Sequence, residues 1–129
     1  MNTFRSKWNN KCVEDMGSVM SKEAKSFVTA FRNMLKRELE PEGIEIVEFT
    51  PNHYDCSGFV RKDDKYIYIS YSIPRYGEII DFDVSGSANG VLYRTATSDH
   101  DYHGGMNRFS SIKDLPRNII NMFENYNRF

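Results

Sequence analysis

The sequence predicts an α+β fold, in which an N-terminal helical segment and a C-terminal helix flank an antiparallel sheet of about five strands. Three observations support this prediction. Residues 21–40 repeat apolar side chains with the helical period, residues 44–96 divide into short alternating runs, and residues 114–126 return to the helical period. A chain of 129 residues has the size of one domain, so residues 1–129 are expected to form a single folded unit.

Residues 1–40 are expected to be helical, in two parts. In the first part, apolar side chains recur every four residues and predict one stripe of a helix. The stripe consists of Phe4, Trp8, Cys12 and Met16. Ser21 is then expected to cap a second helix, with Glu23 in its first turn, where the helix dipole favours an anion. Pro41 and Gly43 predict its end, because proline lacks an amide donor and glycine readily adopts positive φ.

The middle of the chain is expected to form five strands. Their predicted ranges are 44–49, 54–61, 66–73, 78–84 and 91–96. Alternation in the fourth run predicts three inward apolar side chains and two outward carboxylates, namely Ile80, Phe82 and Val84, and Asp81 and Asp83. The turns are too short for the crossover of about a dozen residues that a parallel pair needs, so neighbouring strands are predicted to be antiparallel.

The rest of the chain is expected to be a loop followed by a helix. Residues 97–110 are rich in Asp, His and Gly, which predicts a loop. Ser111 and Asp114 resemble a capping box, and Pro116 is acceptable in a first helical turn. The last helix, at residues 114–126, is expected to cover the same face of the sheet as the long N-terminal helix.

Charge and hydropathy exclude several classes of function. A net charge of −1 provides no overall field that would draw the chain onto nucleic acid or anionic lipid. Residues 1–40 are mildly basic, whereas residues 77–103 are acidic. The N-terminus leads into no apolar segment of a signal peptide, and no run approaches the ~20 residues of a membrane span. We therefore expect a cytoplasmic protein whose two cysteines are reduced.

Two ligand pairs in the sequence can be read as a zinc site. His53 and Cys56 have the same spacing as His100 and His103, and four nitrogen or sulfur ligands suit the tetrahedral preference of zinc. Against this reading, Cys56 lies within a predicted strand, and no tight turn presents a cysteine pair. The alternative is a buried cysteine packed as a small apolar side chain, with three surface histidines. No cofactor is therefore expected, and zinc is the alternative.

Carboxylates gather near the end of the predicted sheet. They are Asp81, Asp83, Asp99 and Asp101. Two of them on the outer face of one strand have a geometry compatible with Mg²⁺ or Ca²⁺. Carboxylates on the solvated face of a strand also keep it from pairing with other chains, which is the simpler interpretation.

Motifs for catalysis and for nucleic-acid binding are weak. There is no nucleophile elbow, no cysteine–histidine arrangement with a third member, and no phosphate-binding glycine loop, so an enzyme is not expected. Tyr66 and Tyr68 can stack on the bases of single-stranded nucleic acid. Asp81 and Asp83 on a neighbouring strand would repel phosphate, so direct nucleic-acid binding is not expected either.

Tyrosines outside the core provide another candidate surface. Tyrosine and arginine are the residues most enriched at binding hot spots. The two best places are the turn with Arg75 and Tyr76 and the loop with Asp99, Asp101 and Tyr102. Ordinary loop chemistry is the alternative at both places.

Several segments resemble one group of proteins. The segments are Tyr54–Val60, the tyrosine-rich strand at 66–73, Gly90–Ala96, Asp101–Phe109 and the helix that opens with Leu115 and Pro116. Over residues 43–126 the chain resembles small accessory proteins of conjugative elements and phages of Gram-positive bacteria, a setting that includes anti-CRISPR proteins. The resemblance implies a non-enzymatic protein in the host bacterial cell that inhibits a type II RNA-guided nuclease by binding it, with a homodimer as an open alternative.

Three functions therefore remain open. The first is an inhibitor whose acidic, tyrosine-rich surface occupies a basic nucleic-acid channel of its target. Its expected binding residues are Arg75, Tyr76, Asp81, Asp83, Asp99, Asp101 and Tyr102. The second is a metal-dependent enzyme or zinc-stabilised domain that uses His53, Cys56, His100 and His103. The third is a structural or regulatory oligomer of a mobile element.

Overall fold

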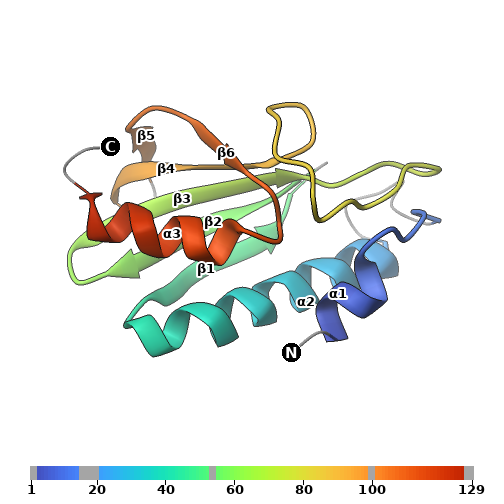
Figure 1. Cartoon of the computed structure of the whole chain (residues 1–129), viewed down its shortest axis with the longest axis horizontal. Helices are drawn as coiled ribbons and strands as arrows, with labels where there is room; N and C mark the ends of the chain where they lie inside the picture. The colour runs from blue at the N-terminus through green and yellow to red at the C-terminus, as the bar shows by residue number, and fades with distance from the viewer. Residues whose placement is uncertain (1–2, 15–20, 53–54, 99–100, 127–129) are drawn as a thin grey trace.

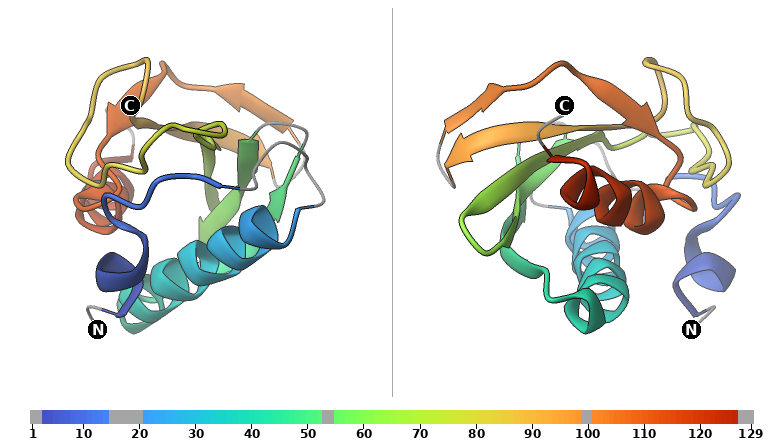
Figure 2. Two further views of the ribbon diagram at one scale, coloured as in Figure 1. Left: turned by 90° about the vertical axis from the view of Figure 1, so that its right-hand side faces the viewer. Right: turned by 60° about the vertical axis from the view of Figure 1, so that its left-hand side comes forward.

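The protein has two layers, an antiparallel sheet and three helices that lie on one side of it (Figures 1 and 2). This is the predicted α+β fold. The structure, a computed structural model, describes residues 3–14, 21–52, 55–98 and 101–126, of which residues 101–103 are described by their backbone alone. Within these ranges no helix is long and apolar enough to span a lipid bilayer.

The longest helix, α2 (Lys22–Leu39), follows its predicted range closely. The Ser21 hydroxyl accepts a hydrogen bond from the Ala24 amide at 3.1 Å, so the predicted N-cap is confirmed. A short 3₁₀ helix, η1 (Glu40–Glu42), holds Pro41 and ends at Gly43, whose φ of +76° is the left-handed conformation that favours glycine. One face of α2 is buried against the sheet, as its apolar period predicts.

The predicted N-terminal stripe is only partly helical. Helix α1 (Thr3–Trp8) buries Phe4 and Trp8, but the helix stops before Cys12. Asn10 has a φ of +65°, which breaks the helical path. Cys12 is exposed and forms an isolated antiparallel bridge with Ile79, while Met16 lies outside the described residues.

All strands of the sheet pair antiparallel, as predicted. Their bounds are β1 (Glu45–Pro51), β2 (Asp55–Lys62), β3 (Lys65–Ser72), β4 (Val91–Ser98), β5 (Asp101–Gly104) and β6 (Arg108–Ser110). The order is β1-β2-β3-β4, and both β5 and β6 pair with β4, so the two short strands form one interrupted edge. The segment predicted as a loop, residues 97–110, therefore holds the end of β4 and both short strands.

The predicted strand at residues 78–84 is wrong. Ile80 and Phe82 are buried as the alternation indicates, but the backbone pairs with the N-terminal segment and not with the sheet. Asn10 donates to the Ile80 carbonyl at 2.7 Å, and the Ile80 amide donates to the Lys11 carbonyl at 3.0 Å. Alternating burial is thus produced here by an anchored loop, in which apolar side chains reach the core from an irregular backbone.

The core lies between the helices and the inner face of the sheet. Phe27 of α2 packs edge-on against Trp8 and Phe31, with ring centroids 5.2 and 5.7 Å apart, and it also contacts Phe4 and Tyr71. Such aromatic pairs add about 0.5–1.5 kcal/mol each beyond the area they bury. They tie α1, α2 and β3 together.

The C-terminal helix, α3 (Leu115–Glu124), closes the other end of the core. The Ser111 hydroxyl accepts a hydrogen bond from the Asp114 amide at 3.0 Å in the turn before the helix, and Asp114 is the N-cap, without a side-chain capping hydrogen bond. After the helix, the Tyr126 hydroxyl lies 2.8 Å from the Tyr66 carbonyl oxygen and 3.1 Å from that of Ala96. These contacts fix the end of the chain to β3 and β4.

Candidate functional site

The most unusual feature of the fold is the connection between β3 and β4, residues 73–90, which we call the β3–β4 loop. It contains no helix or strand of its own. Loops longer than about 12–15 residues without secondary structure are uncommon and are usually either functional or disordered. This loop is fixed in place, because Ile80 and Phe82 are buried in the core beneath it. An ordered loop of this length is the best candidate for a functional segment.

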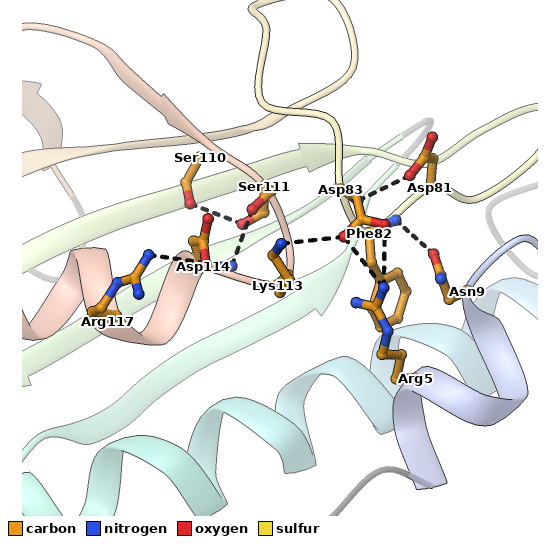
Figure 3. A network of polar contacts seen from close by, with 10 residues as sticks. All are labelled: Arg5, Asn9, Asp81, Phe82, Asp83, Ser110, Ser111, Lys113, Asp114 and Arg117. Carbon is orange, nitrogen blue, oxygen red and sulfur yellow. Dashed lines mark hydrogen bonds and ion pairs between the residues drawn. The ribbon is translucent and has the colours of Figure 1, made fainter.

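The N-terminal segment holds the inner side of the loop. The Gly77 amide donates to the Val13 carbonyl at 2.9 Å, and the Val13 amide donates to the Glu78 carbonyl at 2.8 Å. The Phe82 amide donates to the Asn9 side-chain oxygen at 2.8 Å (Figure 3). Residues far apart in the sequence thus replace the ladder that a regular strand would have provided.

Asp83 lies between two cations from opposite ends of the chain (Figure 3). Its carboxylate forms an ion pair with Arg5 at 3.1 Å and a longer one with Lys113 at 3.6 Å. The Asp81 carboxylate accepts a hydrogen bond from the Asp83 amide at 2.9 Å, which shapes the turn. Asp83 therefore acts first as a link between α1, the loop and the entry to α3.

A cleft of about 650 Å³ lies between the loop, the end of β3 and Asn10. Its walls include Tyr71, Arg75, Glu78 and Asp81. The Arg75 amide donates to the Glu78 carboxylate at 2.6 Å, and the Glu78 amide donates back to the Arg75 carbonyl at 2.9 Å, so the turn at the rim is closed. Gly77 in this turn has a φ of +86°, which other residues adopt only under strain.

Two large side chains project from this rim into solvent. Tyr76 is 75% exposed and Ile79 is 57% exposed, and among the described residues only Met106 is another large apolar side chain left so open. Exposed apolar side chains beside a cleft are typical of surfaces that bind other molecules. We call Arg75, Tyr76 and Ile79 the loop tip.

Tyr71 in the wall of the cleft is not activated as a base. The pKa of Tyr71 is raised, mainly because its phenol is buried. Cys56, Asp81 and Glu78 raise this pKa further. The phenol therefore stays protonated at neutral pH, and it can donate a hydrogen bond but cannot serve as a base.

The structure separates the aspartates that the sequence placed on one surface. Asp81 is half-buried at the cleft, and Asp83 is paired as described above. Asp101 and Tyr102 belong to β5, which pairs with the far end of β4, where Ser98 lies opposite Asp101. The eight residues of β4 span about 24 Å, so the two ends cannot form a single acidic surface. Asp99 lies outside the described residues.

Two of the four candidate zinc ligands, Cys56 and His103, belong to described strands that lie apart. Cys56 is buried in β2, whereas His103 belongs to β5, and β3 and β4 lie between them. Three strand spacings of about 4.8 Å separate the two backbones by roughly 14 Å, which is too far for one tetrahedral site. Burial raises the pKa of the Cys56 thiol, whereas zinc binds the thiolate.

The described residues hold no other cluster suited to a metal. Among them, no group of three His, Cys, Asp or Glu side chains lies close enough to bind a metal ion. His53 and His100 lie outside the described residues. Mg²⁺ or Ca²⁺ on one outer strand face is not supported, because Asp81 and Asp83 are not on a strand.

The sequence analysis missed Ile79 and the contacts of Asn9 and Asn10 with the loop. Ile79 occupies an outward position in the alternation of residues 78–84, and an apolar residue at such a position is the signal that could have identified it. Asn9 and Asn10 carry no local signal, because their partners are distant in sequence.

Comparisons with known proteins identify no relative. No family model matches the chain, and neither a curated protein nor a solved structure shows significant similarity to it.

Proposed function

We propose that this protein acts by binding a protein partner through the loop tip, without catalysis. The observation that supports this most strongly is the construction of the β3–β4 loop. Its inner side is fixed by Asn9, Val13 and two buried apolar residues, while its outer side presents Tyr76 and Ile79 to solvent. A surface that is already ordered loses little conformational entropy on binding, which favours affinity.

The chemistry of the tip suits a protein better than a nucleic acid. Tyrosine and arginine are enriched at protein hot spots, and an aliphatic neighbour adds apolar area. Glu78 and Asp81 line the adjacent cleft and would repel phosphate. With a net charge of −1, no general attraction to nucleic acid compensates for them.

For the target, the resemblance to accessory proteins of mobile elements supports a type II RNA-guided nuclease. Such nucleases have positively charged channels for their nucleic acids. The carboxylates beside the loop tip would face those cations, and Tyr76 would supply apolar contact area. Inhibition would follow from occupying the channel or its entrance.

The proposal is tested by target-DNA cleavage with a reconstituted type II nuclease and its guide RNA. Tyr76→Ala is expected to weaken inhibition at least tenfold, about 1.4 kcal/mol of binding, because hot-spot truncations cost this much or more. Met106→Ala is the matched control, since Met106 is 76% exposed and lies in the connection between β5 and β6. Wild-type protein without any inhibitory effect would rule out this target.

The binding surface is tested separately from the target. Wild-type protein and its Tyr76→Ala and Met106→Ala variants are immobilised. The proteins that each form captures from a lysate of a bacterial host of the mobile element are then compared. Loss of a captured protein with Tyr76→Ala alone supports the loop tip. Equal capture by all three forms would show that the loop tip is not the binding surface.

A further inference from the structure

The outer face of the sheet is a second surface, separate from the loop tip. All three helices lie on the other side of the sheet (Figure 2), and side chains on this face range from the exposed Glu48 to Phe59, which is 6% exposed among its neighbours. Strand register places Glu48, Phe59, Tyr68 and Arg94 in one row across β1 to β4. A neighbouring row contains Glu45, Arg61 and Tyr66, and the row on the other side contains Thr50, Ser57, Ser70 and Leu92.

The central row is packed and ordered. The Phe59 and Tyr68 rings lie 5.3 Å apart, and the Arg94 guanidinium lies over the Tyr68 ring at 5.7 Å. Arg94 also donates to the Asn107 side-chain oxygen at 2.8 Å, which orients it. The row therefore begins with an acid at the β1 edge, has two aromatic rings in the middle, and ends with a base on β4.

We propose that this face binds a second copy of the chain, sheet against sheet. Consider a twofold axis that lies midway between the two sheets, parallel to the strands and level with the gap between β2 and β3. This axis places the β1 end of the row in one copy opposite the β4 end of the row in the other. Glu48 of each copy then faces Arg94 of the other, and Phe59 faces Tyr68. The same operation brings Arg61 opposite Tyr66, and Ser57 opposite Ser70. The surface is thus complementary to itself, as a twofold interface requires.

Charge selects this orientation over the alternative. A twofold axis across the strands would bring Glu48 of both copies together and Arg94 of both copies together. Like charges across an interface are strongly unfavourable, whereas the axis along the strands pairs opposite charges twice. Two aligned sheets pack about 10 Å apart, a distance that two layers of aromatic side chains fill.

A second copy fits the face better than single-stranded nucleic acid. The objection from Asp81 and Asp83 does not apply, because neither residue is on the sheet. Glu48 on β1 would still repel phosphate. In the dimer the same Glu48 is paired with Arg94 of the second copy. The Glu48 carboxylate therefore favours a second copy of the chain and disfavours nucleic acid.

The size of the face predicts a reversible dimer. Four strands with about 20 Å of their length give a patch of roughly 400 Å², half of the ~800 Å² per partner of a standard interface. We therefore expect a dimer that dissociates at micromolar concentration and whose dissociation constant rises with salt.

The test is sedimentation equilibrium of the full chain and of charge-reversal variants. The concentrations run from about 5 to 500 µM, the range in which interfaces of this small size are expected to dissociate. Glu48→Arg and Arg94→Glu are each expected to raise the dissociation constant at least tenfold. The double variant is expected to return it to within about threefold of wild type, since exchanged charges again face each other. Circular dichroism checks that every variant is folded. If Arg94→Glu does not fold, Arg94→Gln is used in its place and Glu48→Arg is still expected to weaken the dimer.

Three outcomes would overturn the inference. They are a monomer throughout the concentration range, a dimer that neither single reversal weakens, and a double variant as weak as the single variants. A different result would assign the face to single-stranded nucleic acid instead. In that case the protein is monomeric, it binds a fluorescent oligo-dT at the same salt concentration, and Tyr68→Ala abolishes this binding. Because Tyr76→Ala is expected to leave the dimer intact, failure of this inference and failure of the proposed function are distinguishable.

Discussion

At the scale of single residues, burial decides how Tyr71 behaves. Its phenol is enclosed beneath the β3–β4 loop, with Cys56 on the neighbouring strand, and the pKa of each group lies above its ordinary value mainly because of burial. Both groups are neutral in the folded protein at physiological pH. They serve as packing residues with a polar tip, and neither supplies catalytic chemistry.

Tyr71 makes stability depend on pH in the alkaline range. Above the ordinary phenol pKa of 10.0 the unfolded chain loses a proton that the folded protein keeps, so the free energy of unfolding falls as pH rises. The decrease in the free energy of unfolding approaches about 1.4 kcal/mol per pH unit well above that pKa. Below that pKa the contribution of Tyr71 to stability is fully present. Tyr71→Phe is expected to reduce the alkaline slope by this amount in urea unfolding between pH 8 and about 11.

Tyr76→Phe is the matched control for this prediction. Tyr76 is 75% exposed, so its replacement removes a phenol that folding does not bury. Its replacement should leave the slope unchanged. An alkaline slope that is identical in wild type and Tyr71→Phe would show that Tyr71 is not buried as described.

At the scale of elements, β1 approaches β2 unusually closely. Register shifts between Ile46 and Glu48, so β1 carries a bulge. A Cβ added to Gly58 would overlap the Glu48 carbonyl and lie 2.7 Å from the Phe49 Cα, both backbone atoms that cannot rotate away. Glycine is therefore required where the bulged strand crosses β2.

Gly58→Ala is expected to destabilise the protein by roughly 1–3 kcal/mol, the usual cost of overpacking a core. Chemical denaturation measures this change. Gly86→Ala is the control, because a Cβ there meets nothing within 4 Å, and it should be neutral. Equal stability of the two variants would contradict the described register of β1.

Local patterns predicted most elements well and failed where pairing is distant. The cap at Ser21 and the helix after it can be read from neighbouring residues, and so can the first three strands. The segment at 78–84 has the alternation of a strand, but its hydrogen-bonding partners are residues 10–13 and not the sheet. Strands β5 and β6 are short, β5 contains Gly104, and both exist because the open edge of β4 accepts them.

At the scale of the whole molecule, α1 and the segment before α3 meet at the β3–β4 loop. Arg5 near the N-terminus and Lys113 before α3 both reach Asp83, and Asn9 holds Phe82 (Figure 3). Exposed ion pairs of this kind contribute little stability individually, about 0–1 kcal/mol. Their role here is to fix position, so that the loop is part of the fold and not an appendage.

The candidate site could be predicted only in part for the same reason. Arg75 and Tyr76 follow from turn chemistry and residue type, whereas Ile79 becomes visible only once residues 78–84 are known not to form a strand. Asp83 reads as a free surface acid in the sequence. Its neutralising partner Arg5 is distant in the chain, and no local pattern contains that information.

The account depends on one physical claim, that the β3–β4 loop is ordered before anything binds it. Amide hydrogen exchange of the free protein tests this most directly, because the amides of Gly77, Ile80 and Phe82 donate to Val13, Lys11 and Asn9. We predict that these three amides exchange as slowly as those in the interior of β3, and much more slowly than the exposed Ser87 and Ala88 of the same loop. Exchange of all five amides at the same fast rate would contradict the account.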